Sequence, residues 1–257
     1  MPIPAISALH VTDDGNIFAG SLVSGLYRSE DAGQQWTYAD STYQPFAATK
    51  IYAARDGGIY VLTQDDGLRR SDDGGVSWIT LPDPGSGYDI SALAENQSQL
   101  LAADFGGSIH GSSDRGATWE EISVLQPLSG RVSRVQLLVR AQSGNMELLA
   151  ATDRGLFLSS DGGATWKLQP VAGVNRDLIL LHESADNSLY AATYRDVYIS
   201  LDGGATWGEV YSSPSQGIKG LMASNRQGDI FIADDALLYQ SDDKGATWTS
   251  MMAPVGL

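Results

Sequence analysis

The chain has 257 residues, of which 42% are hydrophobic, and it contains no cysteine. Without cysteine, the chain has no disulfide bond, thiolate nucleophile or cysteine-bound zinc. The chain has 31 acidic and 16 basic residues, which gives it a formal charge of −15. A surface this acidic disfavours nucleic acid and anionic lipid as partners. No run approaches the roughly 18–20 apolar residues that span a bilayer, so membrane insertion is not predicted.

Short apolar runs bounded by Gly, Asp or Asn predict β-strands along the whole chain. Two examples are Asn16–Gly20 and Ser188–Ala192. No long amphipathic helix is indicated. The sequence therefore predicts an all-β protein.

An octapeptide of the form Ser-x-Asp-x-Gly-x-(Ser/Thr)-Trp recurs six times and accounts for all six tryptophans. The copies are Ser29–Trp36, Ser71–Trp78, Ser112–Trp119, Ser159–Trp166, Ser200–Trp207 and Ser241–Trp248. Successive copies are 42, 41, 47, 41 and 41 residues apart. A period in the low forties is typical of a four-stranded propeller blade. The repeat predicts a single six-bladed β-propeller over residues 1–257.

Each blade is expected to hold four antiparallel strands, with the octapeptide at the turn between the third and the fourth. The expected blades are residues 5–41, 46–83, 88–124, 131–170, 174–212 and 217–252. In the fifth repeat, the expected strands are Leu178–Glu183, Ser188–Ala192, Asp196–Ser200 and Thr206–Tyr211. The longer middle spacing places its extra residues between Glu121 and Asn145, where the longest connection between blades is expected.

The residue types of the octapeptide fit a hairpin turn. Asp accepts backbone N–H bonds, Gly supplies a positive φ, and Trp packs over the hairpin base. The first copy differs, because Gln35 stands where the others have Ser or Thr. We interpret the octapeptides as structural and not as catalytic or metal sites. The structural residues are Asp31, Trp36, Asp73, Trp78, Asp114, Trp119, Asp161, Trp166, Asp202, Trp207, Asp243 and Trp248.

The octapeptide resembles the Asp box of the BNR-repeat propellers, and the resemblance covers essentially the whole chain. That superfamily includes sialidases, photosystem II assembly factors of the Ycf48 type, xyloglucan-degrading glycosidases and sortilin-type receptors. The resemblance implies the fold but leaves the function open, because one scaffold carries hydrolases, receptors and assembly factors. It favours a secreted or periplasmic location. Sialidase activity is not expected, because the chain has no Arg-Ile-Pro motif.

The resemblance also implies that ligands meet the face opposite the octapeptides, where the second-to-third-strand loops and the connections between blades lie. The candidate binding residues there are Lys50, Asp104, Phe105, Arg134, Asp153, Arg176, Tyr194, Asp196, Lys219 and Asp234. Cations would bind a carboxylate, acids would bind hydroxyl groups, and aromatic rings would stack on sugars. The competing interpretation is that the acids form turns and the basic residues balance their charge.

No catalytic residue, metal site or cofactor is assigned. The three histidines, His10, His110 and His182, fall in different blades and are expected to be structural. The glycine pairs belong to octapeptides that precede strands, so they do not form a phosphate loop.

Two functions remain open. The first is a non-catalytic binding or scaffold propeller, expected to be a monomer, that recognises a protein, peptide or glycan on the face opposite the octapeptides. The alternative is a carbohydrate-active enzyme, a glycoside hydrolase or polysaccharide lyase, with its site at the channel mouth.

Overall fold

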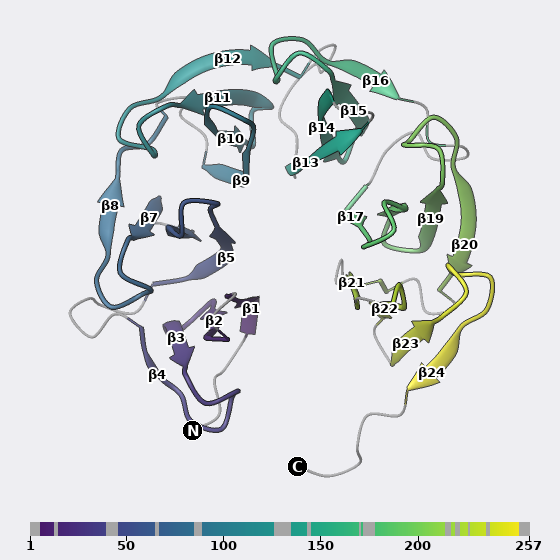
Figure 1. The fold of residues 1–257 in the computed structure, drawn as a ribbon, viewed down its shortest axis with the longest axis horizontal. Helices are drawn as coiled ribbons and strands as arrows, with labels where there is room; N and C mark the ends of the chain where they lie inside the picture. Colours follow the sequence, from purple (N-terminus) through teal and green to yellow (C-terminus); the bar gives the residue numbers. More distant parts are fainter. Residues whose placement is uncertain are drawn as a thin grey trace. The chain divides into compact units, whose positions relative to one another are not determined.

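The computed structural model describes residues 6–12, 15–39, 46–64, 67–84, 89–125, 135–142, 145–169, 171, 178–213, 217–218, 222–225, 227–234 and 237–251. Within these residues, 24 strands form six four-stranded antiparallel sheets, and no helix is present. Each sheet is built from four consecutive strands, as Figure 1 shows. The fold is a six-bladed β-propeller, as the repeat predicts. None of the described residues forms a helix that could cross a membrane.

The chain divides into two compact units, residues 1–122 and 123–257. Blades 1 to 3 belong to the first unit, although β12 runs two residues past its limit. Blade 1 contains β1 (Ile6–Val11), β2 (Ile17–Ser21), β3 (Gly25–Ser29) and β4 (Thr37–Tyr38). Blade 2 contains β5 (Ala48–Ala53), β6 (Ile59–Thr63), β7 (Leu68–Ser71) and β8 (Ile79–Leu81). Blade 3 contains β9 (Ile90–Glu95), β10 (Leu100–Asp104), β11 (Ser108–Ser112) and β12 (Glu120–Val124).

The second unit contains blades 4 to 6. Blade 4 contains β13 (Val135–Gln142), β14 (Asn145–Thr152), β15 (Gly155–Ser159) and β16 (Lys167–Gln169). Blade 5 contains β17 (Leu180–Glu183), β18 (Leu189–Ala192), β19 (Asp196–Ser200) and β20 (Gly208–Ser212). Blade 6 contains β21 (Met222–Ser224), β22 (Ile230–Ala233), β23 (Leu238–Ser241) and β24 (Thr249–Met251).

The predicted strands of blade 5 agree with the structure to within two residues, and β19 matches its predicted range. The extra residues of the middle repeat do not all lengthen a connection. They also extend the first hairpin of blade 4, because β13 and β14 have eight residues each. The strands on either side of residues 125–134 and of residues 170–179 are equally far apart in the sequence, and most of both intervals lies outside the described residues, so the expected longest connection stays a prediction.

The second strands of blades 2 and 3 are buried on both faces. All five residues of β6 and all five of β10 are buried, whereas β4 and β24 are exposed throughout. Neighbouring blades pack face to face, so a strand in the middle of a blade meets apolar residues on both sides. This explains why Leu100–Ala103 is a continuous apolar run instead of an alternating one.

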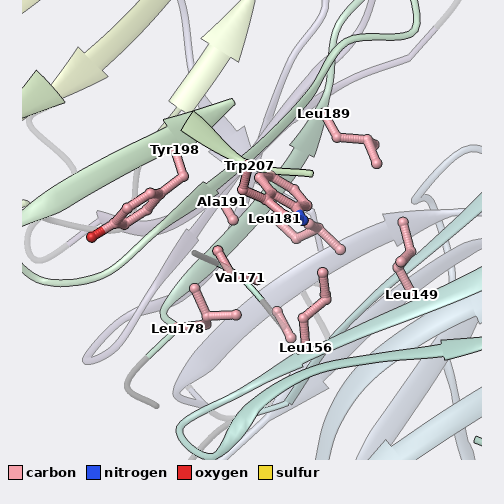
Figure 2. Packing of buried hydrophobic residues seen from close by; sticks show 10 residues of the cluster. Leu149, Leu156, Val171, Leu178, Leu181, Leu189, Ala191, Tyr198 and Trp207 are labelled. Atoms are coloured by element: carbon pink, nitrogen blue, oxygen red, sulfur yellow. The ribbon is translucent and has the colours of Figure 1, made fainter. Parts of the chain in front are cut away.

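Figure 2 shows the core between blades 4 and 5. Leu149 and Leu156 of blade 4 pack in one cluster with Leu181 and Leu189 of blade 5. Trp207, which ends the fifth octapeptide, belongs to the same cluster and is 6% exposed. The octapeptide tryptophan therefore contributes to the packing of one blade on the next.

Each octapeptide joins the third strand of its blade to the fourth, and the third copy illustrates the bonding. Ser112 Oγ accepts the Gly116 N–H at 2.7 Å and donates to Asp114 Oδ1 at 2.8 Å. Asp114 Oδ1 also accepts the Thr118 N–H at 2.8 Å, and its Oδ2 accepts the Thr118 hydroxyl at 2.6 Å. These bonds engage the Asp114 carboxylate and the hydroxyls of Ser112 and Thr118 within the turn, which supports a structural role.

Candidate functional site

Seven of the ten candidate binding residues lie among the described residues. Arg134, Arg176 and Lys219 lie outside them. Three of the seven belong to residues 1–122 and four to residues 123–257; in chain order they are Lys50, Asp104, Phe105, Asp153, Tyr194, Asp196 and Asp234.

Asp104, at the end of β10, is fully buried, and its carboxylate stabilises the loop that follows β10. Its Oδ1 accepts the N–H groups of Gly106 at 2.7 Å and Ser108 at 3.0 Å. Its Oδ2 lies 3.2 Å from Nε2 of His110, which is also buried. The next residue, Phe105, is half-buried, and its N–H donates to Asp89 O at 3.2 Å. The contacts of Asp104 favour the turn-forming interpretation for this acid.

Lys50 lies exposed on β5 and links two blades. Its Nζ donates to the backbone carbonyl of Ser91 on β9 at 2.6 Å. In blade 1, Ser7 stands at the corresponding position of β1 and donates to the carbonyl of Ala48 on β5. In blades 1 and 2, a side chain on the first strand therefore binds the first strand of the next blade in the chain.

The acids of the second unit also bond within their own unit. Asp196 Oδ1 accepts the Ser212 hydroxyl at 2.7 Å. Asp234 is 7% exposed, and its Oδ1 accepts the Leu237 N–H at 2.9 Å. Its Oδ2 lies 3.3 Å from the hydroxyl of Tyr211. Asp153 lies half-buried in the two-residue turn between β14 and β15.

Large apolar side chains are exposed on the side of the blades that carries the second-to-third-strand loops, here called the loop side. In blade 1, Leu22 and Val23 form the turn between β2 and β3 and are 46% and 64% exposed. Ile6, which pairs through β1 with Ser21 beside this turn, is 58% exposed. In the second unit, Tyr194 is 54% exposed in the loop between β18 and β19, and Leu237 and Leu238 are exposed in blade 6. Of these residues, sequence reasoning selected only Tyr194. The signal for blade 1 was an aliphatic pair inside a turn, Leu22-Val23.

The histidines have different surroundings. His110 pairs with Asp104, whereas His182 Nε2 lies 2.9 Å from Ser224 Oγ on β21. Burial lowers the pKa of His182. The described residues contain no group of three or more His, Asp or Glu side chains that could hold a metal ion.

Two pockets of the first unit lie on the octapeptide side, which sequence reasoning set aside. One has a volume of about 510 Å³ and lies between blades 1 and 2, where its lining includes Val11, Phe18, Ile59 and Gly74. The other has a volume of about 230 Å³ and lies between blades 2 and 3, where Arg115 is among its lining residues.

A network of charged groups connects blades 2 and 3 beside the smaller pocket. Asp56 Oδ2 lies 3.2 Å from Arg70 Nη2 and 2.9 Å from Arg115 Nε. Burial acts to raise the pKa of Asp56, but the Gly58 N–H and the two guanidinium groups hold it below its usual range. Burial raises the pKa of Tyr60 to about 12. The ion pairs of Asp56 with Arg70 and Arg115 therefore link blades 2 and 3.

The pKa of the Glu183 carboxyl group is raised, in contrast to the lowered pKa of Asp56. Glu183, at the end of β17, is partly buried, and this burial raises its pKa against the opposing charge of Arg140. A raised carboxyl pKa is a property that general acids share.

No protein-family model matches the chain, and no curated protein matches it. Solved structures do. The chain is similar to Ycf48 bound to D1 peptide, with a TM-score of 0.72 and 18% identity over 97% of this chain and 84% of that one. It is similar to virginiamycin B lyase from Staphylococcus aureus, with a TM-score of 0.77 and 11% identity over 98% of this chain and 85% of that one. A third similarity is to the extracellular domain of a putative one-component system from B. thetaiotaomicron, with a TM-score of 0.75 and 16% identity over 96% of this chain and 36% of that one. At these identities, the shared property is the propeller fold.

Proposed function

We propose that this protein is a non-catalytic binding propeller that recognises a protein or peptide through its second-to-third-strand loops, on the side opposite the octapeptides. The observation that carries the proposal is a contrast on that side. Three of its acids, Asp104, Asp196 and Asp234, accept hydrogen bonds from their own blades or the neighbouring connection, while large apolar side chains on the same side are exposed. The hydrogen bonds within the octapeptides support, in addition, a place for the chain among the Asp-box propellers.

The acids of the loops are poorly placed for catalysis. A general acid or base must reach the proton that it transfers. Asp104 and Asp234 are 0% and 7% exposed, and both accept N–H bonds from the loops that follow them. They are better suited to holding the loops in shape than to contacting a substrate.

The exposed aliphatic residues of blade 1 suit a polypeptide partner better than a sugar. Leu22 and Val23 are aliphatic, so they offer no ring for stacking and no polar group for hydroxyl recognition. Apolar side chains that gather in exposed loops mark protein interaction sites. The solved Ycf48 structure, which holds a D1 peptide, supports the capacity of this fold for peptide binding.

Selection from a random peptide library against the intact chain, followed by fluorescence anisotropy with the enriched peptides, tests the proposal. A Leu22→Ser/Val23→Ser variant should weaken binding by tenfold or more, because it removes the apolar contacts. Val76→Ser and Leu201→Ser are the matched controls, since both residues are similarly exposed, at 67% and 68%, but lie in octapeptides. Equal affinity in the loop variant and the controls would contradict the proposal.

The carbohydrate-active alternative is favoured by one observation, the raised pKa of Glu183. The similar virginiamycin B lyase supports only the capacity of this fold for catalysis, because its name gives virginiamycin B and not a carbohydrate as the substrate. It predicts that the chain releases product from neutral or acidic oligosaccharides. Product formation that is lost in Glu183→Gln, or in Asp153→Asn or Asp196→Asn, would establish this alternative in place of a purely binding function.

A further inference from the structure

The pocket between blades 2 and 3 lies within the first unit, and the residues that line it are all described. Its volume of about 230 Å³ limits a ligand to a small molecule. The buried residues Tyr60 and Leu100 form part of its wall. Two basic and two acidic side chains line it, so its charges balance: Arg55, Arg115, Asp56 and Glu95.

Two of these four charges bind each other. Asp56 Oδ2 lies 2.9 Å from Arg115 Nε and 3.2 Å from Nη2 of the buried Arg70. The Asp56 carboxylate therefore already has two guanidinium partners. One positive and one negative side chain of the pocket remain, Arg55 and Glu95.

Arg55 and Glu95 lie next to each other, but their side-chain charges do not pair. Glu95 Oε2 accepts the backbone N–H of Arg55 at 2.8 Å and lies 3.5 Å from the Tyr52 hydroxyl. Within the part of the chain that the structure describes, the Arg55 guanidinium forms no hydrogen bond or ion pair, and Glu95 Oε1 accepts no hydrogen bond. The pocket therefore presents a guanidinium and a carboxylate oxygen to solvent.

The two charges are separated by a spacing that one small ligand can bridge. The Glu95 carboxylate is fixed at the backbone of Arg55, so the two charged groups are at most about one arginine side chain apart. Both also act on Tyr52: burial raises its pKa, the charge of Glu95 adds to that rise, and the charge of Arg55 opposes it. In an α-amino acid, one carbon atom separates the ammonium from the carboxylate, so each group can reach its opposite charge. Arg forks bind carboxylates well, because they can donate two parallel hydrogen bonds.

The larger pocket, between blades 1 and 2, lacks half of this arrangement. Arg55 lines it too, but its described lining includes no acid. Ala53 stands at the last position of β5, where Glu95 stands at the last position of β9. Of these two pockets, only the smaller one offers both charges.

The rest of the smaller pocket is polar. Gln97, Gln99 and Ser113 line it, and their side chains form no hydrogen bond within the described residues. Amide and hydroxyl groups can both donate and accept hydrogen bonds, so they suit a short polar side chain. A zwitterion has no net charge, so the formal charge of −15 neither attracts nor repels it as a whole.

We infer that the pocket between blades 2 and 3 binds a free α-amino acid with a short polar side chain, whose carboxylate pairs with Arg55 and whose ammonium pairs with Glu95. The site lies on the octapeptide side and does not depend on the loop-side function proposed above.

Titration of the isotope-labelled chain with L-asparagine, followed by NMR at pH 6, tests this inference. Saturable shifts are expected at the amides of Arg55, Ser98 and Ser113. Nα-acetyl-L-asparagine lacks the ammonium and L-asparaginamide lacks the carboxylate, so each should bind at least tenfold more weakly. Equal binding of the three probes, or no saturable shift with L-asparagine, would overturn the inference.

Two variants assign the charges to their residues. Arg55→Gln keeps the backbone N–H that Glu95 accepts, and it should weaken L-asparagine binding at least tenfold and abolish the preference over L-asparaginamide. Glu95→Gln keeps an acceptor oxygen for that N–H, and it should abolish the preference over Nα-acetyl-L-asparagine. Retained affinity and preference in either variant would overturn the inference.

Matched controls change the same residue types outside this pocket. Arg195→Gln and Glu120→Gln each remove an exposed charge, and both should bind L-asparagine as the parent does. A loss in these controls equal to that in Arg55→Gln and Glu95→Gln would overturn the assignment to the pocket. The Leu22→Ser/Val23→Ser variant should also bind L-asparagine normally, and Arg55→Gln should bind the selected peptides normally. The failure of one proposal can therefore be told from the failure of the other.

Discussion

Arg115 Nε lies 2.9 Å from Asp56 Oδ2 and thereby joins the third octapeptide to the first turn of the preceding blade. The backbone φ of Arg115 is 64°, a value that residues other than glycine rarely adopt. The same carboxylate also lies 3.2 Å from Nη2 of Arg70, which is 2% exposed. An octapeptide therefore closes its own hairpin and also fastens two blades together.

Removing Asp56 should cost more stability than removing Arg115. Arg115 is 61% exposed, so Arg115→Ala should lower the free energy of unfolding by at most about 1 kcal/mol. Asp56→Ala takes one of two carboxylates from the buried guanidinium of Arg70, for an expected loss of about 2–4 kcal/mol. Urea denaturation followed by tryptophan fluorescence measures both values. Equal losses would show that Arg70 does not depend on Asp56.

Gly75 should tolerate no side chain. Its φ is 85°, and an added Cβ would lie 2.5 Å from Phe18 Cε1 in the preceding blade. Gly75→Ala should therefore lower the free energy of unfolding by about 2–4 kcal/mol through backbone strain and overpacking.

Gly74→Ala is the matched control, because Gly74 has a φ of 69° and open space around it. Ala32 already occupies the same octapeptide position at a φ of 57°. The control should lose only about 1 kcal/mol, the cost of a positive φ. A control as damaging as Gly75→Ala would show that strain, and not the contact with Phe18, sets the cost.

The fold could be predicted because each blade repeats the same local chemistry. Six octapeptides set the period, and the burial of middle strands such as β10 on both faces produced apolar runs that mark strands. The boundaries in blade 4 could not be predicted, because extra residues can extend either a hairpin or a connection without changing the spacing of the octapeptides. In the structure they extend β13 and β14.

The site was harder to predict, since residue type does not reveal what a side chain already contacts. Asp104 and a free catalytic acid look alike in sequence, and only the structure shows that the Asp104 oxygens face Gly106, Ser108 and His110. The pocket beside Gly74 could not be predicted from the sequence either. Only the structure shows that this pocket is open, whereas Arg115, at the same position of the next octapeptide, reaches Asp56 of the preceding blade.

Acid should destabilise the fold through the octapeptide aspartates. The Thr118 hydroxyl and N–H and the Ser112 hydroxyl lower the pKa of Asp114 to about 2, and the pKa values of Asp202 and Asp243 are also about 2. In the unfolded chain, these groups return to about 3.9, so the unfolded state binds more protons in between. Their contribution is present above about pH 4 and is lost as the pH falls toward about 2.

Urea denaturation at several pH values between 7 and 2.5 measures this loss. Asp114→Asn is the control, because it removes one titrating group, and it should show a shallower decline in the free energy of unfolding below pH 4. The same slope in the parent and in Asp114→Asn would contradict the assignment of the effect to this aspartate.

The first octapeptide lacks one hydrogen bond that the other five have. In those five, a Ser or Thr hydroxyl donates to the second carboxylate oxygen of the Asp at 2.5–2.6 Å. In the first, the Gln35 N–H donates to Asp31 Oδ1 at 2.8 Å, but the residue has no hydroxyl. The Gln35 N–H and the Ser29 hydroxyl lower the pKa of Asp31 most, and the N–H groups of Gln34 and Asp31 add smaller effects in the same direction. Gln35→Thr should supply the missing donor and lower the pKa of Asp31 further, toward the value of about 2 at Asp114.

Carbon-detected NMR titration of the Asp31 carboxyl group measures the change. Gln35→Val has the same branched shape without the hydroxyl and should leave the pKa where it is. If the Val variant shifts the pKa of Asp31 as far as the Thr variant does, the hydroxyl is not its cause.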